Sequence, residues 1–291
     1  MASTAWLAIV TGASRGFGRA IALELVATAA KRAPLHLVLL ARGATGLDGT
    51  AAAARQESSS VAGNRHPLTI ETQVLDLGDL DVLEARFQEI LKRTDPRVYA
   101  RSFLINNAGS LGPLCGVRET PSLAVLRAAF DFNVTSCAWL TAAFARAVTA
   151  TGAGAAAGAV ASDEGAGPSV IINVSSLAAI QPFETWGAYC AGKAARDMWH
   201  ATLPKELSNT GKSSALTVLS YAPGAMDTDM QTEVRASSGC DPELAEAFRR
   251  AHIEGNLVDP RDSAAKCVRL AVLNPHSFAP GAHADYHDRM R

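Results

Sequence analysis

The chain has 291 residues and a formal net charge of −1; 48% of its residues are hydrophobic and 19% are charged. This composition supplies enough apolar side chains for a large buried core, and the lack of a positive excess argues against nucleic acid or a membrane surface as a partner. Five scattered cysteines without a C-x-x-C pair, no long apolar run and no signal-peptide pattern lead us to expect a cytoplasmic protein with no metal site.

Short apolar runs rich in β-branched residues alternate along the chain with longer helical stretches. After the first run, residues 17–30 place Ile21, Leu25 and Val26 at helical spacing. Strand–helix alternation of this kind predicts the α/β class, with a doubly wound parallel sheet and helices on both faces. The runs expected to form strands are residues 7–10, 35–40, 68–75, 103–105, 170–174 and 216–219.

Two segments depart from this alternation. Residues 43–63 are rich in Ala, Gly and Ser, and we expect them to be partly helical because residues 51–56 have high helix propensity. Residues 149–168 are small and low in complexity, which predicts a surface loop before the fifth strand. Because strands of the same pattern flank both segments, we expect a single domain over residues 1–291.

A glycine-rich turn follows the first predicted strand and opens the first helix. Its spacing, Gly12-x-x-x-Gly16-x-Gly18, permits a tight turn, and the helix N-terminus offers free N–H groups to a pyrophosphate. A purely structural turn is the alternative, but the position between strand and helix favours a dinucleotide. The residues expected to contact a cofactor here are Gly12, Ala13, Ser14, Arg15, Gly16, Phe17 and Gly18.

Arg42 and Gly43 follow the second predicted strand, where a site that prefers NAD usually carries an acid for the ribose 2′-hydroxyl. Arg42 and Arg15 would instead bring two guanidinium groups to a 2′-phosphate. Two solvated surface arginines are the alternative. We therefore expect NADPH/NADP+ rather than NADH as the cofactor.

A serine at the end of the fifth predicted strand, and a tyrosine and a lysine that follow it, suggest proton transfer to a carbonyl. Ser176 ends the strand, Tyr189 follows thirteen residues later, and Lys193 lies four residues after Tyr189. On a helix this i, i+4 spacing puts tyrosine and lysine on one face, where the ammonium would lower the pKa of the phenol. Tyr189 could then donate a proton to a carbonyl oxygen held by the Ser176 hydroxyl while hydride reaches the carbon. A surface helix pair is the alternative for the tyrosine–lysine spacing alone.

Taken together, these motifs resemble the short-chain dehydrogenase/reductase superfamily. The resemblance implies one Rossmann-type domain with a seven-stranded parallel sheet, and a proton relay from Tyr189 through Lys193, a water and the backbone at Asn133. It also implies a homodimer formed through helices near residues 123–150 and 188–207. The motifs that carry it are Thr11-Gly12-x-x-x-Gly16-x-Gly18, Asn106-Asn107-Ala108-Gly109, Asn133, Ser176, Tyr189-x-x-x-Lys193 and Pro223-Gly224.

The same resemblance implies further cofactor contacts. Asp76 and Leu77 would lie at the adenine ring, although Asp76 also has the position of a helix N-cap after the third strand. A second group would line the cofactor, and a third would close over the nicotinamide and pyrophosphate. These residues are Asn107, Ala108 and Gly109, and Met226, Asp227, Thr228, Asp229, Met230 and Gln231.

Within the superfamily, residues 105–112, 173–197, 221–231 and 280–288 resemble the sepiapterin reductase family. The resemblance implies that the carboxylate of Asp285 anchors a pterin, since it can accept two parallel N–H bonds. Further substrate contacts implied are Ser176, Leu177, Tyr189 and Gly224.

Three functions remain open at this point. The first is NADPH-dependent reduction of the side-chain ketones of a 6-substituted pterin, as in tetrahydrobiopterin biosynthesis. The second is a broad carbonyl or diketone reductase, for which Asp285 would be dispensable. The third is a non-catalytic protein that binds NADPH and regulates a partner, against which the intact Ser176, Tyr189 and Lys193 argue.

Overall fold

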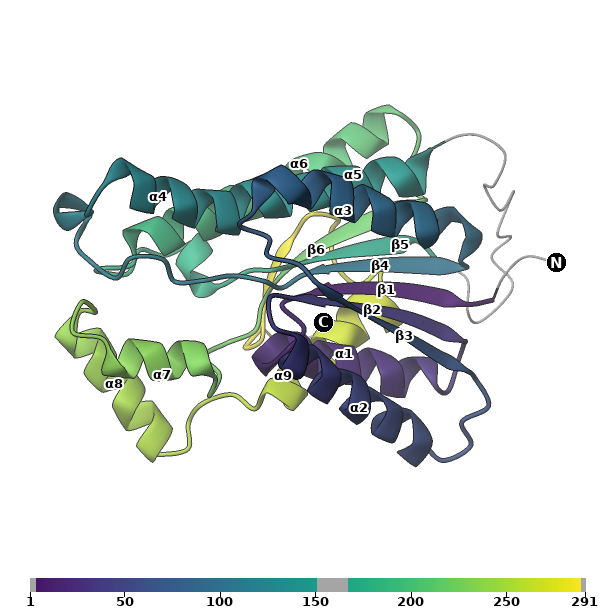
Figure 1. The fold of residues 1–291 in the computed structure, drawn as a ribbon, viewed down its shortest axis with the longest axis horizontal. Helices are drawn as coiled ribbons and strands as arrows, with labels where there is room; N and C mark the ends of the chain where they lie inside the picture. Colours follow the sequence, from purple (N-terminus) through teal and green to yellow (C-terminus); the bar gives the residue numbers. More distant parts are fainter. Residues whose placement is uncertain (1–3, 151–166, 289–291) are drawn as a thin grey trace.

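The computed structural model describes residues 4–150 and 167–288. Seven strands form one parallel sheet in the order β3-β2-β1-β4-β5-β6-β7 (Figure 1). From β1 the chain adds β2 and β3 successively on one side of the sheet. It then returns to the other side of β1 and adds β4, β5, β6 and β7 in turn. The strands are β1 (Trp6–Thr11), β2 (Leu35–Ala41), β3 (Leu68–Val74), β4 (Arg101–Asn106), β5 (Ser169–Val174), β6 (Leu216–Ala222) and β7 (His283–Asp285).

Helices cover both faces of the sheet, and two more lie beyond its carboxyl edge. Figure 1 shows α1, α2 and α9 on one face, α3, α4, α5 and α6 on the other, and α7 and α8 to the side. Short 3₁₀ and π turns interrupt the connections. The α-helices are α1 (Gly16–Ala29), α2 (Ala44–Ser60), α3 (Leu80–Arg93), α4 (Leu123–Phe130), α5 (Ser136–Thr149), α6 (Gly187–Asn209), α7 (Asp229–Ala236), α8 (Pro242–Ile253) and α9 (Pro260–Val268). The short turns are η1 (Pro96–Val98), η2 (Val117–Glu119), η3 (Asp131–Thr135), η4 (Leu177–Ala179) and η5 (Arg269–Leu273).

The alternation of side chains along β1 explains why its sequence is apolar throughout. Ala8 and Val10 pack into the core that contains α1 and α9, whereas Leu7 and Ile9 pack into the core that contains α3 and α5. Successive strand residues point to opposite faces, so a strand that is covered on both faces needs apolar side chains at every position. The expectation of a doubly wound parallel sheet is therefore confirmed.

Some expected elements differ from those observed. The segment expected to be partly helical is helical from Ala44 to Ser60. The stretch near 123–150 is one helical path interrupted by the π turn Asp131–Thr135. The short strand β7 is not marked by any apolar run. The expected loop 149–168 lies, apart from its ends, outside the described residues.

In the parts that the structure describes, no helix is both long and apolar enough to cross a membrane. The same residues contain no group of three or more His, Cys, Asp or Glu side chains suited to hold a metal. The strand order reverses between β1 and β4, so the connections that leave these two strands pass to opposite sides. A crevice is therefore expected at the carboxyl ends of β1 and β4.

Candidate active site

A cavity of about 740 Å³ opens at the carboxyl ends of the strands, where that crevice is expected. Residues after β1, β2, β4, β5 and β6 line it, and α7, α8 and the C-terminal segment close its other side. Its volume is in the range of small-molecule and cofactor sites.

The glycine turn after β1 is held against the end of β4. Asn107 donates side-chain hydrogen bonds to the carbonyls of Thr11 (3.0 Å) and Gly12 (3.2 Å). Gly12 has φ +64°, and a Cβ there would lie 2.8 Å from the Asn107 amide nitrogen; a Cβ on Gly18 would meet the Gly12 carbonyl. Both positions therefore require glycine.

This turn leaves the N-terminus of α1 open to the cavity. Arg15 is the N-cap residue but makes no side-chain cap, and the first turn of α1 contains no acidic residue. Ser14, Gly16 and Phe17 line the cavity beside it. Uncapped N–H groups at a helix N-terminus fit a pyrophosphate, so the residues present suit a dinucleotide.

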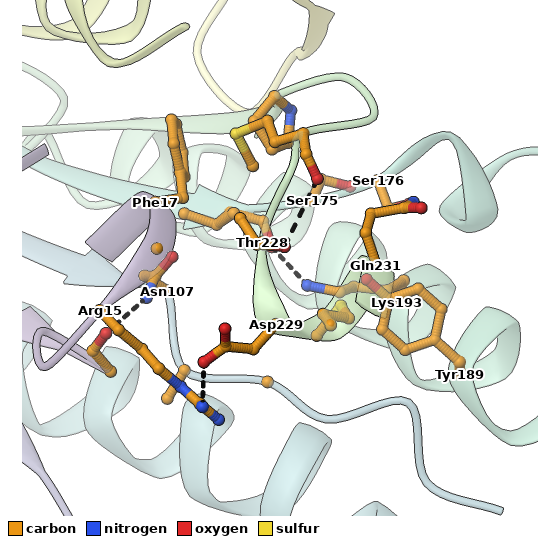
Figure 2. A pocket seen from close by; sticks show the side chains of 18 of the residues that line it. Arg15, Phe17, Asn107, Ser175, Ser176, Tyr189, Lys193, Thr228, Asp229 and Gln231 are labelled. Carbon is orange, nitrogen blue, oxygen red and sulfur yellow. Dashed lines mark hydrogen bonds and ion pairs between the residues drawn. The ribbon is translucent and has the colours of Figure 1, made fainter. Parts of the chain in front are cut away.

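Two arginines line the end of the cavity nearest β2. The guanidinium of Arg42 lies over the ring of Phe132, 5.7 Å from its centroid. Arg15 forms an ion pair with Asp229, which begins α7 on the opposite side of the cleft (Figure 2). Both guanidinium groups therefore line the cavity, and that of Arg15 is paired with the Asp229 carboxylate.

Asp76 does not cap a helix, so this expectation was wrong. Helix α3 begins at Leu80, and Asp79 is its N-cap residue. The Asp76 side chain instead accepts a hydrogen bond from the backbone N–H of Gly78 (2.9 Å) in a local turn. Asp76 is not among the residues that line the cavity, whereas Leu77 is.

Ser176, Tyr189 and Lys193 converge on the same wall of the cavity (Figure 2). Tyr189 and Lys193 lie one turn apart on α6, and Lys193 Nζ is 5.5 Å from the centroid of the Tyr189 ring. Lys193 Nζ donates a hydrogen bond to the Val174 carbonyl (2.8 Å). Ser176 follows β5, where its Oγ accepts from the N–H of Ala178 (3.1 Å) and caps η4.

Burial dominates the protonation of this pair. It raises the pKa of Tyr189 to about 12, although a hydrogen bond with Ser176 and the charge of Arg196 favour the phenolate. Burial, with the nearby Arg196, also holds the pKa of Lys193 well below its usual range. Burial therefore outweighs the stabilisation of the phenolate that was expected from Lys193. The pKa of Tyr189 is raised rather than lowered, and the site holds Tyr189 as a phenol, the form that donates a proton.

Asn133 lies behind the catalytic pair, in the π turn between α4 and α5. Its side chain exchanges hydrogen bonds with the backbone of Ser110, accepting at 2.9 Å and donating at 3.0 Å. A Cβ on Gly109 would lie 3.6 Å from Asn133 Oδ1 and 3.7 Å from Lys193 Nζ, so the three residues are neighbours. Turns of this kind are frequent at functional sites.

The cavity brings together most of the residues expected from the sequence. Those lining it are Gly12, Ser14, Arg15, Gly16, Phe17, Arg42, Gly43, Leu77, Asn107, Ala108, Gly109, Ser176, Leu177, Tyr189, Lys193, Gly224, Met226, Thr228, Asp229, Met230, Gln231 and Asp285. Those outside its lining are Ala13, Gly18, Asp76, Asn133 and Asp227. Asp227 faces away, toward Arg235 (3.1 Å) and His252 (3.4 Å).

An aromatic wall completes the cavity: Phe183 and Trp186 are expected from the sequence as apolar walls, whereas Phe248 is not. Phe248 from α8 stacks on Trp186, with centroids 6.0 Å apart and planes at 13°. Phe183 lies on the same indole at 5.5 Å, and the Trp186 ring meets Tyr189 edge-on at 5.6 Å. Phe248 belongs to a helix distant in sequence, so no local pattern could have placed it here.

Asp285 ends β7 and lines the same cavity as Tyr189. Its Oδ1 accepts from the N–H of His287 (2.8 Å). Among the described residues no side chain forms an ion pair with it. A half-buried carboxylate with one oxygen free suits a ligand that donates N–H groups.

Comparison with known proteins agrees with this arrangement. Residues 7–239 match the family model of short chain dehydrogenases. The chain is 35% identical over 281 residues to the sepiapterin reductase of Rattus norvegicus, covering 96% of this chain and 95% of that protein. It is 30% identical over 254 residues to the benzil reductase ((S)-benzoin forming) of Bacillus subtilis, covering 87% and 88%. The fold superimposes on a short-chain dehydrogenase/reductase from Saccharomyces cerevisiae with a TM-score of 0.73, at 23% identity over 97% and 96% of the two chains.

Proposed function

Because the chain belongs to the short-chain dehydrogenase family and is an oxidoreductase acting on CH–OH or C=O groups, we propose that it reduces the side-chain ketones of a 6-substituted pterin with NADPH. The observation that carries this proposal is the half-buried carboxylate of Asp285, which has no ion-pair partner among the described residues and lines the cavity that holds the buried phenol of Tyr189. The likeness to sepiapterin reductases over nearly the whole chain supports it.

For the cofactor, we propose NADPH rather than NADH. Arg42 stands after β2, where a carboxylate for the ribose 2′-hydroxyl would otherwise be expected, and Arg15 lines the same cavity. Two guanidinium groups suit a 2′-phosphate, with which they can form charge-assisted hydrogen bonds.

Residues of this chain supply the proton that the carbonyl oxygen takes up during reduction. The bound nicotinamide would supply hydride to the carbonyl carbon. The phenol of Tyr189 donates its proton to the carbonyl oxygen, which the Ser176 hydroxyl holds in place. Lys193, next to the phenol and close to Asn133, offsets the charge that forms on Tyr189 and connects it to the relay behind the site.

A second candidate is reduction of aromatic vicinal diketones. The aromatic wall of Phe183, Trp186 and Phe248 would accept such rings as readily as a pterin. The 30% identity to a bacterial benzil reductase over most of both chains supports this alternative.

The two candidates are separated by NADPH oxidation with sepiapterin and with butane-2,3-dione, in wild type and Asp285→Asn. If Asp285 anchors the pterin, the variant raises KM for sepiapterin about 10- to 100-fold, as expected for losing a hydrogen bond to a charged group, and leaves the diketone unaffected. Asp262→Asn, an exposed change on α9, is the control. Equal effects on both substrates would reject the anchor.

For assembly, we propose a homodimer through α4, α5 and α6. Leu123 on α4 and Met198 and Trp199 on α6 expose 81%, 70% and 50% of their surfaces. Exposed apolar groups on neighbouring helices favour association. Light scattering that gives the mass of a monomer would refute this proposal.

A further inference from the structure

A buried ion pair ties the strand of Asp285 to the helix of Tyr189. His283 Nδ1 lies 2.7 Å from Asp197 Oδ2, and the two side chains expose only 20% and 15% of their surfaces. Asp197 lies on α6, one turn after Lys193 and two turns after Tyr189. His283 lies on β7, two residues before Asp285. The pair therefore joins the element that carries the proton donor to the element that carries the proposed anchor.

On the side of α6, Asp197 is fixed by a second bond. Its Oδ1 accepts from Asn173 Nδ2 of β5 (2.8 Å), and Asn173 Oδ1 accepts from Nε of Arg196 (2.9 Å). Arg196 also donates to the carbonyls of Asn106, the last residue of β4, and of Ala108 just after it. These bonds hold the central part of α6 rigidly against the ends of β4 and β5.

On the side of β7, fewer contacts are available. β7 has three residues and lies at the edge of the sheet, where β6 is its one pairing strand among the described residues. From the opposite face, Lys266 of α9 donates to the backbone carbonyl of Tyr286. His283 and Asp285 share the other face, because strand residues two apart point the same way. α6 also packs against Gly281 just before β7, where a Cβ would lie 3.0 Å from Ala201 Cα, and His283 adds a side-chain bond within the strand through which α6 can set its position.

His283 binds α6 through one ring nitrogen, Nδ1. Nδ1 faces Asp197 and lies 3.5 Å from Ser175 Oγ, beside Ser176. Nε2 is buried and has no hydrogen-bond partner among the residues described. The hydrogen bond with Asp197 raises the pKa of His283, which strengthens the pair.

We propose that His283, acting through Asp197, is a positioning residue that sets the separation between Tyr189 and Asp285 and so selects substrates that reach both. This inference rests on the proposed role of Asp285. A pterin held at Asp285 must present its ketone to Tyr189, so a shift of β7 misplaces the reacting carbonyl. A small diketone bound at Ser176 and Tyr189 does not touch β7 and is insensitive to that shift.

The test compares His283→Asn with His283→Gln, because an asparagine amide can replace the Nδ1 donor and a glutamine amide reaches toward the place of Nε2. We expect His283→Asn to resemble wild type. We expect His283→Gln to lower kcat/KM for sepiapterin by about 10- to 100-fold, the effect of a misplacement near 1 Å, with butane-2,3-dione and the Kd of NADPH unchanged. Asp197→Ala, which removes both acceptor oxygens of Asp197, should lower kcat/KM for sepiapterin at least as much as His283→Gln does, and the double variant should be no worse than Asp197→Ala alone, because the same bond is already broken.

Several results would overturn the inference. Equal losses on both substrates would show a general structural role, and wild-type kinetics in His283→Gln would show no role. If His283→Gln does not fold, as judged by circular dichroism, Asp197→Ala carries the same comparison. A wild-type enzyme that does not reduce sepiapterin overturns the proposed function and this inference with it. A wild type that does reduce it, beside an unaffected His283→Gln, overturns this inference alone.

Discussion

Lys193 Nζ lies 5.5 Å from the centroid of the Tyr189 ring, and its hydrogen bond goes to the carbonyl of Val174. The ammonium is therefore held by the end of β5 and lies over the face of the Tyr189 ring. Both groups are buried, so each is biased toward its neutral form, with the pKa of Tyr189 raised and that of Lys193 lowered. A neutral phenol next to a carbonyl is the acid that reduction requires.

Removing the phenol hydroxyl should abolish turnover and spare the fold. Tyr189→Phe keeps the ring contact with Trp186 but has no proton to donate, so we expect kcat to fall about 10²- to 10⁴-fold, the usual contribution of a general acid. Binding of NADPH, followed by tryptophan fluorescence, should be unchanged. Tyr99→Phe, the same substitution far from the cavity, should retain wild-type kcat. A Tyr189→Phe variant with wild-type kcat would contradict the assignment of Tyr189 as the proton donor.

The raised pKa of Tyr189 has a direct spectroscopic consequence. A pKa of about 12 keeps the phenol protonated as the pH rises through the neutral and mildly alkaline range. We therefore expect the tyrosinate absorbance of wild type and of Tyr189→Phe to coincide up to about pH 10, where ordinary tyrosines begin to ionise. An alkaline loss of activity below that pH then belongs to Lys193, whose lowered pKa lets it lose its charge earlier. A tyrosinate signal near neutral pH that is present only in wild type would contradict this prediction.

The sequence was sufficient to predict the sheet because buried parallel strands are continuous apolar runs. It was insufficient for β7, since His283, Ala284 and Asp285 are only half-buried and show no such run. The segment after β2 is poor in large apolar residues, yet it forms the helix α2, whose Leu47, Ala51 and Ala54 pack against the core.

The site was predictable where its residues are adjacent in sequence and unpredictable where they meet only in the fold. The turn after β1 and the pair on α6 each follow from local spacing. The stacking of Phe248 on Trp186 joins two helices that no motif connects. The pKa of Tyr189 depends chiefly on its burial, which the i, i+4 spacing does not specify.

Cofactor preference should depend on Arg42. Arg42→Ala removes one guanidinium from the proposed 2′-phosphate site, so we expect KM for NADPH to rise about 10- to 100-fold, with KM for NADH nearly unchanged. Arg19→Ala, on the exposed side of α1, is the control. Equal losses for both cofactors in Arg42→Ala would contradict the preference for NADPH.

Arg15 should contribute to the same preference. Asp229→Asn frees Arg15 from its exposed ion pair and should tighten NADPH binding by no more than about fivefold, since such pairs contribute about 0–1 kcal/mol.

The aromatic wall should matter only for ring-bearing substrates. Phe248→Ala removes the ring stacked on Trp186, so we expect KM for sepiapterin and benzil to rise about 2- to 10-fold, in line with the energy of an aromatic pair. KM for butane-2,3-dione should change little because it has no ring. Ile253→Ala in the same helix is a matched control, since its side chain is 83% exposed. If KM for butane-2,3-dione rises as much as KM for benzil, Phe248 acts by shaping the whole cavity rather than by contacting rings.

Two glycine-to-alanine substitutions should have opposite effects. At Gly18 a Cβ would meet the Gly12 carbonyl and the Asn107 amide, so Gly18→Ala should displace the turn, cost about 1–3 kcal/mol and abolish NADPH binding. At Gly49, within α2, a Cβ would meet nothing within 4 Å, and alanine should stabilise the helix by about 0.5–1 kcal/mol. In thermal unfolding each kcal/mol corresponds to about 2–4 °C in Tm for a chain of this size. A Gly18→Ala variant that binds NADPH as wild type does would show that the close contact between this turn and Asn107 is not needed to hold the cofactor.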